Sequence, residues 1–450
     1  MRILLAVHQF PPDYCAGTET LTLRTAQELQ RRGHTVRVLS GGEYAPGMAS
    51  SYDYTYRKVL VRRLNPAPSP GLIGITRSYN RPELAALLQQ ALVEFRPSVV
   101  HAFHLRRLTL ELLSACHRLE LPVTFTLTDY WCCCPTGQLM LTDQSVCSGP
   151  DADSANCARH LAQRLVPPLG RTPLTAWRML IGLGFFKGLR QRPPAMRKAL
   201  AACGVLMVSS DAMAEVFHRN GFSDATLRIQ PYGIDLDGLR DLPPRSPWRP
   251  EQRPMRVAFI GTLRPAKGAH VLLSALISWA ETEAAAAGQA TIALPLDVNL
   301  YGSLEDDPAY VTGLERQITR LSSMAPQVTV GLRGCFEPDQ LFRVLHDQDV
   351  LVVPSLWREN SPLIVLQALA ARLPLLASDV DGIHQQINPG RNGLLFPPGD
   401  ADALGSALAG LWRSPAQLDQ LGRGPVTVQG IGAYVDRLEE VYRELVDVQR

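Results

Sequence analysis

The chain has 450 residues, of which 46% are hydrophobic and 19% are charged, so it can bury large cores and is neither disordered nor a coiled coil. Lys and Arg total 45 and Asp and Glu total 42, and the resulting formal charge of +3 is too small to indicate nucleic-acid binding. We therefore expect a globular protein of two or three domains with no nucleic-acid partner.

The first residues, MRILLAVHQFPP, combine one basic residue with a short apolar run that ends in prolines. This pattern is typical of a buried strand rather than of a signal peptide or a membrane anchor. No run of 18 apolar residues occurs elsewhere in the sequence. The sequence therefore predicts a cytoplasmic protein.

Short apolar runs alternate with segments of helical period twice along the chain, which predicts an α/β fold with two Rossmann-like domains. The first series predicts a helix at 81–95 and strands at 2–7, 35–40, 59–64, 99–103, 122–128 and 205–209. The second series predicts strands at 255–261, 298–302, 328–334, 349–355 and 374–379.

A proline-rich stretch separates the two series and sets the expected domain boundaries. We expect a first domain at 1–232, a linker at 233–254 and a second domain at 255–430. Residues 431–450 have apolar residues at helical spacing and are expected to form a helix that packs back on the first domain.

Three loops after predicted strands carry candidate binding residues. Gly17 opens a helix where the backbone could approach a ligand closely. Arg264 and Lys267 lie at the mouth of another helix, where a guanidinium fork and an ammonium suit an anion. Glu359 precedes a third helix and could accept hydrogen bonds from hydroxyls, beside free N–H donors. Taken singly, each feature also fits an ordinary turn or a solvated face.

Together with the pieces VVHAFH, TLTDYWCCCP, PYGIDLD, LYGS and GRNGLLFPPGD, these loops resemble the family-4 glycosyltransferases over nearly the whole chain. The resemblance implies two Rossmann-like domains facing each other across a cleft, the B-type glycosyltransferase fold. It also implies a retaining transferase that needs no cofactor or metal for catalysis. The sugar would pass from a nucleotide-diphosphate sugar to a glycan or lipid-linked acceptor, in the synthesis of cell-surface polysaccharide or glycoconjugate.

The same resemblance assigns roles to residues. Arg264 and Lys267 would hold the donor's diphosphate, and Glu359 would bind the hydroxyls of the transferred sugar. No carboxylate of the first domain is clearly matched to the role of a nucleophile, so none is expected, and Asp129 completes the expected catalytic set as the one nearby candidate. The expected donor site adds Gly17, Thr128, Asn360, Ser361, Leu363 and Gln367.

Two positions depart from the family pattern. Thr128 stands before Asp129 where the family has histidine, and Gln367 stands where it has a second glutamate. Either the donor sugar is unusual, or His101 or His104 compensates, or activity is weak. Two other functions also stay open, a nucleotide-sugar epimerase and a non-catalytic subunit that binds nucleotide sugar.

Five of the nine cysteines lie in one window, inside an expected Cys-rich insertion at 132–161. Cys134, Cys147, Cys157 and His160 form the pattern C-x12-C-x9-C-x2-H, and three thiolates with one imidazole make a complete tetrahedral zinc set. The sequence thus favours a structural zinc site, with free thiols or a disulfide as the alternatives.

A basic stretch follows the cysteines. Between Ser154 and Ser210 there are nine Lys or Arg residues and no Asp or Glu, with apolar and aromatic residues among them. Such a segment can lie on an anionic membrane surface or bind a lipid-linked diphosphate. We therefore expect peripheral contact with the inner face of a membrane through residues 154–200, with an ordinary pair of helices as the alternative.

Overall fold

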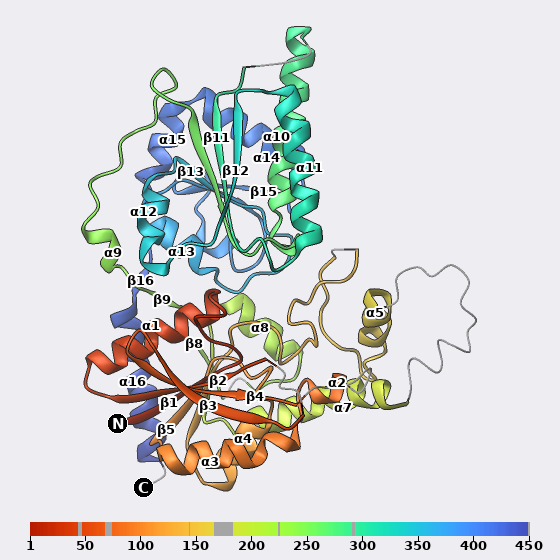
Figure 1. Ribbon diagram of the computed structural model, residues 1–450, viewed down its shortest axis with the longest axis vertical. Helices are drawn as coiled ribbons and strands as arrows, with labels where there is room; N and C mark the ends of the chain where they lie inside the picture. The colour runs from red at the N-terminus through yellow and green to blue at the C-terminus, as the bar shows by residue number, and fades with distance from the viewer. Residues whose placement is uncertain are drawn as a thin grey trace. The chain divides into compact units, whose positions relative to one another are not determined.

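The computed structural model describes residues 1–43, 47–67, 74–143, 145–165, 183–223, 226–289 and 293–448. The chain divides into two compact units, Met1–Gly233 with Ile431–Arg450 (unit 1) and Ile234–Gly430 (unit 2). Each unit is built on a parallel sheet with helices packed against it (Figure 1). The predicted α/β architecture of two Rossmann-like domains is confirmed.

Unit 1 contains an eight-stranded sheet. In spatial order its strands are β3 (Ser50–Tyr56), β4 (Val59–Asn65), β2 (Thr35–Gly41), β1 (Arg2–Val7), β5 (Val99–Ala102), β6 (Val123–Thr126), β7 (Val205–Val208) and β8 (Leu227–Ile229). Its helices are α1 (Gly17–Arg31), α2 (Gly74–Arg77), α3 (Ala85–Phe95), α4 (Glu111–Arg118), α5 (Ala155–Leu165), α7 (Leu183–Leu200), α8 (Asp211–Arg219) and α16 (Ile431–Asp447).

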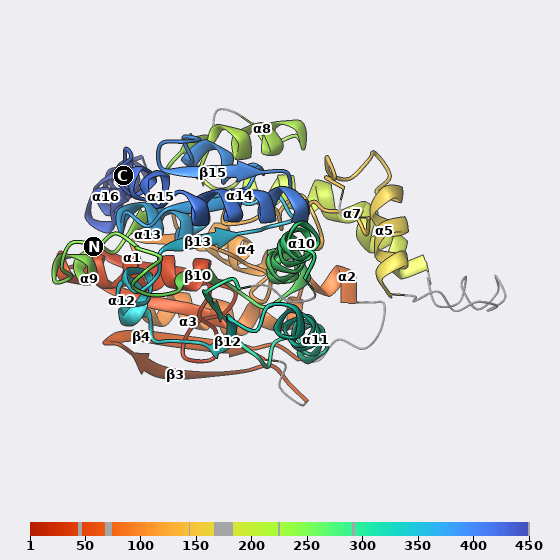
Figure 2. The same ribbon diagram turned by 90° about the horizontal axis from the view of Figure 1, so that it is seen from above.

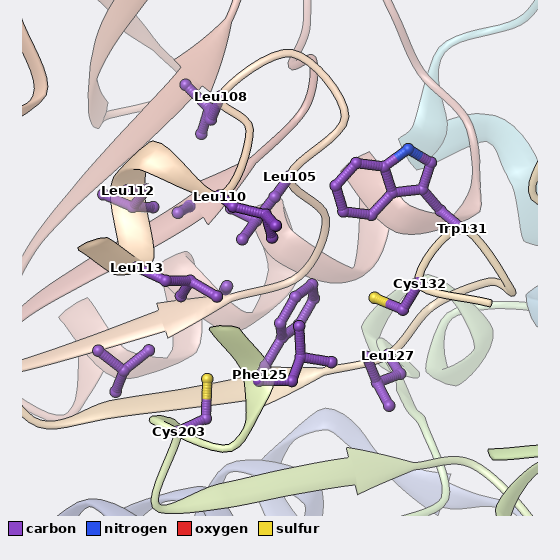
Figure 3. Packing of buried hydrophobic residues seen from close by; sticks show 14 of the residues in the cluster. Leu105, Leu108, Leu110, Leu112, Leu113, Phe125, Leu127, Trp131, Cys132 and Cys203 are labelled. Atoms are coloured by element: carbon purple, nitrogen blue, oxygen red, sulfur yellow. The ribbon is translucent and has the colours of Figure 1, made fainter. Parts of the chain in front are cut away.

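The central strands of unit 1 are buried on both faces. All the residues of β5 and β6 are buried, and so are Ile3–Val7 of β1, as expected for parallel strands covered by helices. Leu105, Leu112 and Phe125 belong to the main core cluster, which Figure 3 shows from close by. This buried sheet fixes the strand ends from which the candidate binding loops of unit 1 emerge.

The edge strand β3 differs from the rest of this sheet because it pairs with β4 in the antiparallel direction. Its sequence, SSYDYTY, is polar and mostly exposed. The turn between the two strands places Arg57 and Lys58 at positive φ, which is the conformation of a two-residue hairpin turn but not its usual glycine or asparagine chemistry. The sequence analysis missed β3 for both reasons.

Unit 2 contains a six-stranded parallel sheet. In spatial order its strands are β12 (Val328–Gly334), β11 (Leu296–Tyr301), β10 (Met255–Ile260), β13 (Val350–Val353), β14 (Leu375–Ser378) and β15 (Gly393–Phe396). Its helices are α9 (Asp237–Arg240), α10 (Ala269–Ala287), α11 (Pro308–Met324), α12 (Leu341–His346), α13 (Leu363–Ala370), α14 (Ala401–Arg413) and α15 (Pro415–Gly422). Helices α10 and α11 lie side by side (Figure 2).

The stretch predicted as a linker belongs largely to unit 2. Trp248 is 2% exposed within the core cluster of that unit, and its indole N–H donates to the carbonyl oxygen of Arg253 at 3.0 Å. The Arg245 guanidinium donates to the carbonyl oxygen of Leu345 at 2.8 Å. The proline content of this segment therefore led to the prediction of a linker, although the segment packs against unit 2. The chain crosses between the units near β9 (Gly233–Ile234) and β16 (Gln429–Gly430), which pair with each other.

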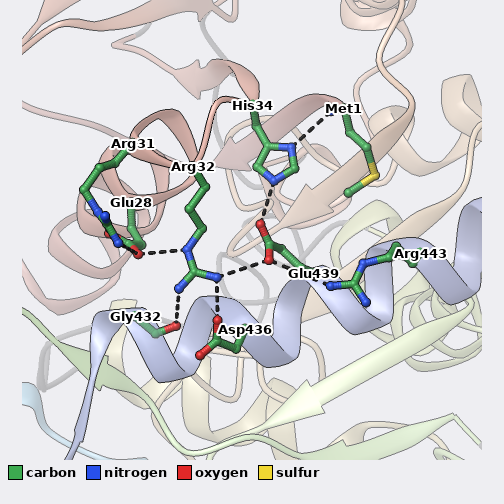
Figure 4. A network of polar contacts seen from close by, with 9 residues as sticks. All are labelled: Met1, Glu28, Arg31, Arg32, His34, Gly432, Asp436, Glu439 and Arg443. Atoms are coloured by element: carbon green, nitrogen blue, oxygen red, sulfur yellow. Dashed lines mark hydrogen bonds and ion pairs between the residues drawn. The ribbon is translucent and has the colours of Figure 1, made fainter.

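Helix α16 completes unit 1 with residues from the far end of the chain. Tyr434 and Tyr442 are fully buried. Arg32, which follows α1, donates to Asp436 at 2.5 Å and to Glu439 at 3.1 Å. The second terminal nitrogen of the same guanidinium donates to the carbonyl oxygen of Gly432 at 2.8 Å (Figure 4). Apolar burial and this polar network together hold α16 beside α1.

Candidate functional site

Both sheets reverse their strand order at one point. In unit 2 the order corresponds to 3-2-1-4-5-6, with the reversal between β10 and β13, and in unit 1 the reversal lies between β1 and β5. Open parallel sheets bind ligands outside the carboxyl ends of the strands at such a switch point. The loops after β1, β5, β10 and β13 are therefore the places where binding residues are expected.

In unit 2, two of these loops are held tightly against each other. Gly268 lies at φ +76°, and a Cβ there would come within 1.8 Å of the Pro354 carbonyl oxygen. The Leu356 N–H donates to the carbonyl oxygen of Ala266 at 2.9 Å. These contacts bring Lys267, from the loop after β10, to Glu359, from the loop after β13.

Glu359 is 5% exposed, and one of its carboxylate oxygens is the centre of a small polar cluster. Oε1 accepts hydrogen bonds from the Lys267 ammonium at 2.7 Å, the Ser355 hydroxyl at 2.8 Å and the Trp357 indole N–H at 2.8 Å. The Lys267 nitrogen also lies 5.0 Å from the centre of the Trp357 ring. The second oxygen accepts no hydrogen bond from the residues that the structure describes, so it can still receive a ligand hydroxyl.

The backbone around Glu359 is fixed by a third loop, which follows β14. The Glu359 N–H donates to the Asp381 carbonyl oxygen at 3.0 Å, and the Arg358 guanidinium lies 2.8 Å from the Asp381 carboxylate. Gly382 lies at φ +81°, where a Cβ would meet the Glu359 carbonyl oxygen at 2.3 Å. Arg358 is thus committed to a structural ion pair, while Lys267 faces the cluster.

The other predicted donor residues of unit 2 surround this cluster. Arg264 is exposed and forms no ion pair within the described part of the chain. Asn360 is 9% exposed, and the Ser361 hydroxyl accepts a hydrogen bond from the Gln386 amide at 3.0 Å. Leu363 is the first residue of α13, and Gln367 is half-buried in its second turn.

In unit 1, Gly17 is the exposed first residue of α1. A Cβ at this position would meet nothing within 4 Å, so packing inside the protein does not require glycine there. The first turn is capped by Glu19, whose carboxylate accepts from the Ala16 N–H at 3.0 Å. The helix therefore begins with open space at its positive end, where an anion is favoured.

Four ionisable side chains form a line behind this turn. The His104 imidazole Nε2 lies 3.0 Å from Asp129 Oδ2, and the His8 ring lies 4.0 Å from the His104 ring, centre to centre. His8 Nε2 lies 3.5 Å from Glu19 Oε1. The Arg106 N–H donates to His104 Nδ1 at 3.1 Å, so Nδ1 is an acceptor. The hydrogen of the imidazole is therefore on Nε2, which donates a hydrogen bond to Asp129.

The surroundings shift the pKa values of three of these side chains in different directions. Burial raises the pKa of the Glu19 carboxyl, and burial together with the neighbouring His104 and Arg106 lowers the pKa of His8 well below its usual value. For Asp129, burial acts to raise the pKa, but the charge and hydrogen bond of His104 oppose it, and the net pKa is lowered. Asp129 is therefore a carboxylate, and with a side chain 29% exposed it is the member of the line that solvent reaches most.

Thr128 and His101 have structural contacts instead. The Thr128 hydroxyl donates to the Phe103 carbonyl oxygen at 2.9 Å. His101 is fully buried between the Tyr442 hydroxyl at 2.6 Å and the Thr126 hydroxyl at 2.8 Å, and burial lowers its pKa to about 3. Of the two histidines considered as substitutes for the family residue, His104 is the one beside Asp129.

Several residues of these clusters were missed by the sequence analysis. His8 directly follows the first strand, and its place at the carboxyl end of a strand beside the switch point was a usable signal. Glu19, Ser355 and Trp357 offered none, because a buried capping carboxylate and two donors that orient another residue are recognisable only by contact.

The predicted zinc ligands Cys134, Cys147, Cys157 and His160 all line one pocket of unit 1. Among the described residues, no three His, Cys, Asp or Glu side chains are already gathered as a metal-binding group. The predicted membrane segment lies partly outside the described residues, including Arg171, Trp177 and Arg178. Its Arg192 is 1% exposed and so cannot meet a membrane surface.

The chain matches two family models, one in each unit. Residues 16–131 match the model described as Glycosyltransferase Family 4, and residues 254–414 match the model described as Glycosyl transferases group 1. The matches include Gly17, Asp129, Lys267 and Glu359. The chain belongs to the family-4 glycosyltransferases.

Curated relatives are similar over part of the chain. A D-inositol 3-phosphate glycosyltransferase of Nocardia farcinica is 29% identical over 220 residues, which cover 44% of this chain and 46% of the relative. The D-rhamnosyltransferase WbpZ of Pseudomonas aeruginosa is 26% identical over 205 residues, with the same two shares. The matched region spans less than half the length of these relatives.

Solved structures share the fold over the whole chain. Anabaena Alr3699/HepE, in complex with UDP and glucose, aligns with a TM-score of 0.64 at 16% identity and covers 98% of this chain and 99% of its own. Sucrose-phosphate synthase from Thermosynechococcus elongatus aligns with a TM-score of 0.65 at 16% identity and covers 99% of each chain. At this identity the likeness establishes the fold, which is the B-type glycosyltransferase fold.

Proposed function

We propose that this protein is a retaining glycosyltransferase that moves a sugar from a nucleotide-diphosphate sugar to a hydroxyl of a glycan or lipid-linked acceptor, in the synthesis of cell-surface polysaccharide or glycoconjugate. The observation that carries the proposal is the cluster around Glu359, in which a buried carboxylate and the Lys267 ammonium lie together at the switch point of unit 2. The family to which the chain belongs and the UDP bound by HepE support it.

In this proposal the cations of unit 2 hold the donor's diphosphate. Exposed Arg264 offers a guanidinium fork to phosphate oxygens, and Lys267 turns from Glu359 toward the diphosphate when the donor binds. The charge that develops on the leaving diphosphate is then stabilised by fixed protein cations, so a divalent metal is not needed for that step. The backbone from Asn360 to Leu363 adds N–H donors at the start of α13.

Glu359 takes the transferred sugar in the same proposal. Its first carboxylate oxygen is already oriented by Ser355 and Trp357, so the second oxygen is positioned to accept hydrogen bonds from sugar hydroxyls. Gln367 offers an amide to the nucleotide ribose in place of the family's carboxylate. Binding energy from the sugar and the nucleotide then fixes the anomeric carbon for attack.

The reaction proceeds without an enzyme nucleophile. The acceptor oxygen forms a bond to the anomeric carbon on the face that the diphosphate leaves, the bond from that carbon to the diphosphate oxygen breaks, and the acceptor proton passes to the departing phosphate. Asp129, oriented by His104, binds a substrate hydroxyl from unit 1. In this way Asp129 and the cluster of Glu19, His8 and His104 take over the role of the family histidine, whose position Thr128 occupies in this chain.

The test is transfer of radiolabelled sugar from a panel of UDP-, GDP- and TDP-hexoses to a membrane glycolipid extract. We expect acceptor-dependent transfer. Lys267→Ala should lower kcat/KM about 100-fold, as removal of one group that stabilises developing charge does in other enzymes. Glu359→Gln should lower it about as much, because the carboxylate that positions the sugar is lost. Product analysis by NMR should show the anomeric configuration of the donor.

Arg316→Ala is the matched control, because Arg316 is an exposed cation of the same unit on α11. It should keep wild-type kcat/KM. Conversion of a nucleotide sugar without any acceptor would instead indicate an epimerase, and binding without conversion would indicate a subunit that only binds the donor. Either result contradicts the proposal.

Membrane contact through residues 154–200 stays a prediction. No helix in the described part of the chain is long and apolar enough to cross a membrane. The exposed cations of α7, including Lys187 and Arg190, still suit the headgroups of anionic lipid. Co-sedimentation with anionic vesicles at low salt, compared with vesicles of neutral lipid, tests this contact.

A further inference from the structure

Three separate backbone segments bring the predicted zinc ligands to one place in unit 1. Cys134 lies in a turn closed by the Gly137 N–H, which donates to the Cys134 carbonyl oxygen at 3.0 Å. Cys147 ends a short hairpin, in which its N–H donates to the Leu139 carbonyl oxygen at 2.7 Å. Cys157 and His160 lie three residues apart in α5, on one face of that helix.

All four side chains line the same pocket. The spacing pattern in the sequence did not require this, because 25 residues lie between Cys134 and His160. Apart from the turn, the hairpin bridge between Met140 and Val146 and the helix α5, this insertion has little regular structure. A loop of this kind commonly depends on a metal or a disulfide for its stability.

Two of the sulfur atoms already have hydrogen-bonding groups beside them, and for Cys147 one of these groups is a fixed N–H donor. The Gly149 N–H donates to Cys147 Sγ at 3.4 Å, although the Cys147 thiol also lies 3.7 Å from the carbonyl oxygen of the same glycine. Cys134 Sγ lies 3.2 Å from the Thr136 hydroxyl. Donors that point at sulfur stabilise a thiolate, and such outer contacts orient metal ligands.

A second, independent observation is a buried positive charge without a carboxylate partner. Arg192 of α7 is 1% exposed, and its guanidinium stacks 5.3 Å above the Trp131 ring and donates to the backbone oxygens of Trp131 and Cys132. Within the described part of the chain, its Nε atom has no hydrogen-bond partner and no Asp or Glu forms an ion pair with it. A buried arginine that lacks a counter-charge is costly, since its guanidinium stays protonated.

The Arg192 guanidinium donates to the backbone oxygen of Cys132, which lies two residues before the predicted ligand Cys134. A zinc ion bound by three thiolates and one neutral imidazole carries one net negative charge. Such a centre would supply the counter-charge that Arg192 lacks, whereas neutral thiols or a disulfide would leave the cation uncompensated.

We propose that Cys134, Cys147, Cys157 and His160 bind one structural zinc ion, and that Arg192 balances the charge of this centre. Binding releases three thiol protons to solvent and forms three Zn–S bonds and one Zn–N bond. The four side chains are not yet gathered as a closed set, so they turn into the pocket that they line when the metal binds. The centre then fixes the loop from Cys132 to Leu161.

The zinc loop also reaches the candidate site of unit 1. Gly137 lies at φ +78°, and a Cβ there would come within 2.9 Å of Asp129 Oδ2. The turn that carries Cys134 is therefore packed against the carboxylate that His104 orients. Loss of the metal should disturb Asp129 as well as the loop.

The experiment is metal analysis of the full-length protein after purification without chelator and dialysis against metal-free buffer. We expect about one zinc per chain in the wild type, and less than about a tenth of that in Cys157→Ser and in His160→Ala, because the loss of one of four ligands opens the site. Cys335→Ser is the matched control, since Cys335 is an exposed cysteine of unit 2, and it should retain the wild-type zinc content.

Cobalt replacement gives a readout that does not depend on the folding of a variant. Titration of the zinc-depleted wild-type protein with Co²⁺ should produce the visible absorption of a tetrahedral cobalt site and the near-ultraviolet charge-transfer bands of thiolate ligands, at one equivalent.

In Arg192→Met, zinc should be lost to a chelator at least about tenfold faster than in the wild type, because the metal centre would then be a buried charge without a partner.

A wild-type protein that contains no zinc and gives no cobalt charge-transfer bands would overturn the proposal. So would a disulfide between any two of Cys134, Cys147 and Cys157 in the non-reduced protein, found by peptide mass mapping. An unchanged rate of zinc loss in Arg192→Met would overturn the assigned role of that arginine. None of these outcomes depends on the proposed transferase activity, so the two proposals can fail separately.

Discussion

At the scale of single residues, the sequence identified both charged groups of the Glu359 cluster but could not pair them. Lys267 and Glu359 are 92 residues apart and meet because Gly268 allows one loop to cross closely over another. The donors that orient the carboxylate, Ser355 and Trp357, had no recognisable pattern. Motifs thus predicted which residues bind, while their contacts follow from loop packing that no local pattern encodes.

Gly17 permits a test that separates binding from stability. It opens α1 in space that a methyl group would not fill, so Gly17→Ala should leave the free energy of unfolding unchanged or slightly raised. If a ligand's phosphate approaches this backbone closely, the added methyl group should raise the KM for the donor at least about tenfold. Urea unfolding and steady-state kinetics measure the two effects.

Gly313→Ala is the matched control for this substitution, because Gly313 lies in α11 of unit 2 and a methyl group added there would also meet nothing within 4 Å. It should leave the KM for the donor unchanged and raise the free energy of unfolding by about 0.5–1 kcal/mol, because Gly313 lies in the interior of the helix. A KM for Gly17→Ala that equals the wild-type value would remove Gly17 from the binding site.

At the scale of elements, the buried parallel strands were predictable because they are short apolar runs, as β1, β5, β10 and β13 show. The edge strand β3 and the very short β8 were not, because neither buries a continuous apolar face. The helical period of the last segment predicted α16, but the arginine that fixes it to α1 follows a helix some 400 residues earlier. Pairings between such distant elements depend on the whole fold.

Arg32→Met should show how much this network contributes. The substitution leaves the Glu28 carboxylate, which is only 8% exposed, with Arg31 as its remaining cation, and it takes Arg32 away from the Glu439 carboxylate, which is 16% exposed. We expect the free energy of unfolding to fall by about 1–3 kcal/mol, measured by urea unfolding at pH 7.5. Arg320→Met, which removes an exposed ion pair with Glu281, should cost about 0–1 kcal/mol. If the free energy of unfolding falls equally in the two variants, the network around Arg32 stabilises the protein no more than an exposed ion pair does.

At the scale of the whole molecule, buried histidines should make the protein sensitive to acid. The folded pKa of His101 is about 3, whereas the unfolded chain has an ordinary value near 6.5, so only the unfolded state binds this proton between those pH values. The stabilisation from the neutral folded form is complete above pH 6.5 and is lost as the pH falls toward 3. His8, whose pKa is also lowered by burial, acts in the same direction.

The free energy of unfolding should therefore fall by about 1.4 kcal/mol per pH unit from His101 as the pH drops from 6.5 toward 3, and His8 should steepen this fall. His101→Gln should be less stable than the wild type at pH 7.5, because the contacts with Tyr442 and Thr126 are altered, but its slope between pH 6.5 and 5 should be shallower. His117→Gln, at an exposed position, should keep the wild-type slope. A slope unchanged by His101→Gln would contradict this assignment.

The central claim is that the loops of unit 2 around Lys267 and Glu359 bind a nucleotide-diphosphate sugar. Isothermal titration calorimetry with UDP-, GDP- and TDP-hexoses tests it most directly. We predict that at least one of them binds the wild type and Arg316→Ala with the same Kd, and that Lys267→Ala weakens this binding at least about tenfold, through the loss of one charge-assisted contact. If no nucleotide sugar binds, or if Lys267→Ala binds as tightly as the wild type, the account is contradicted.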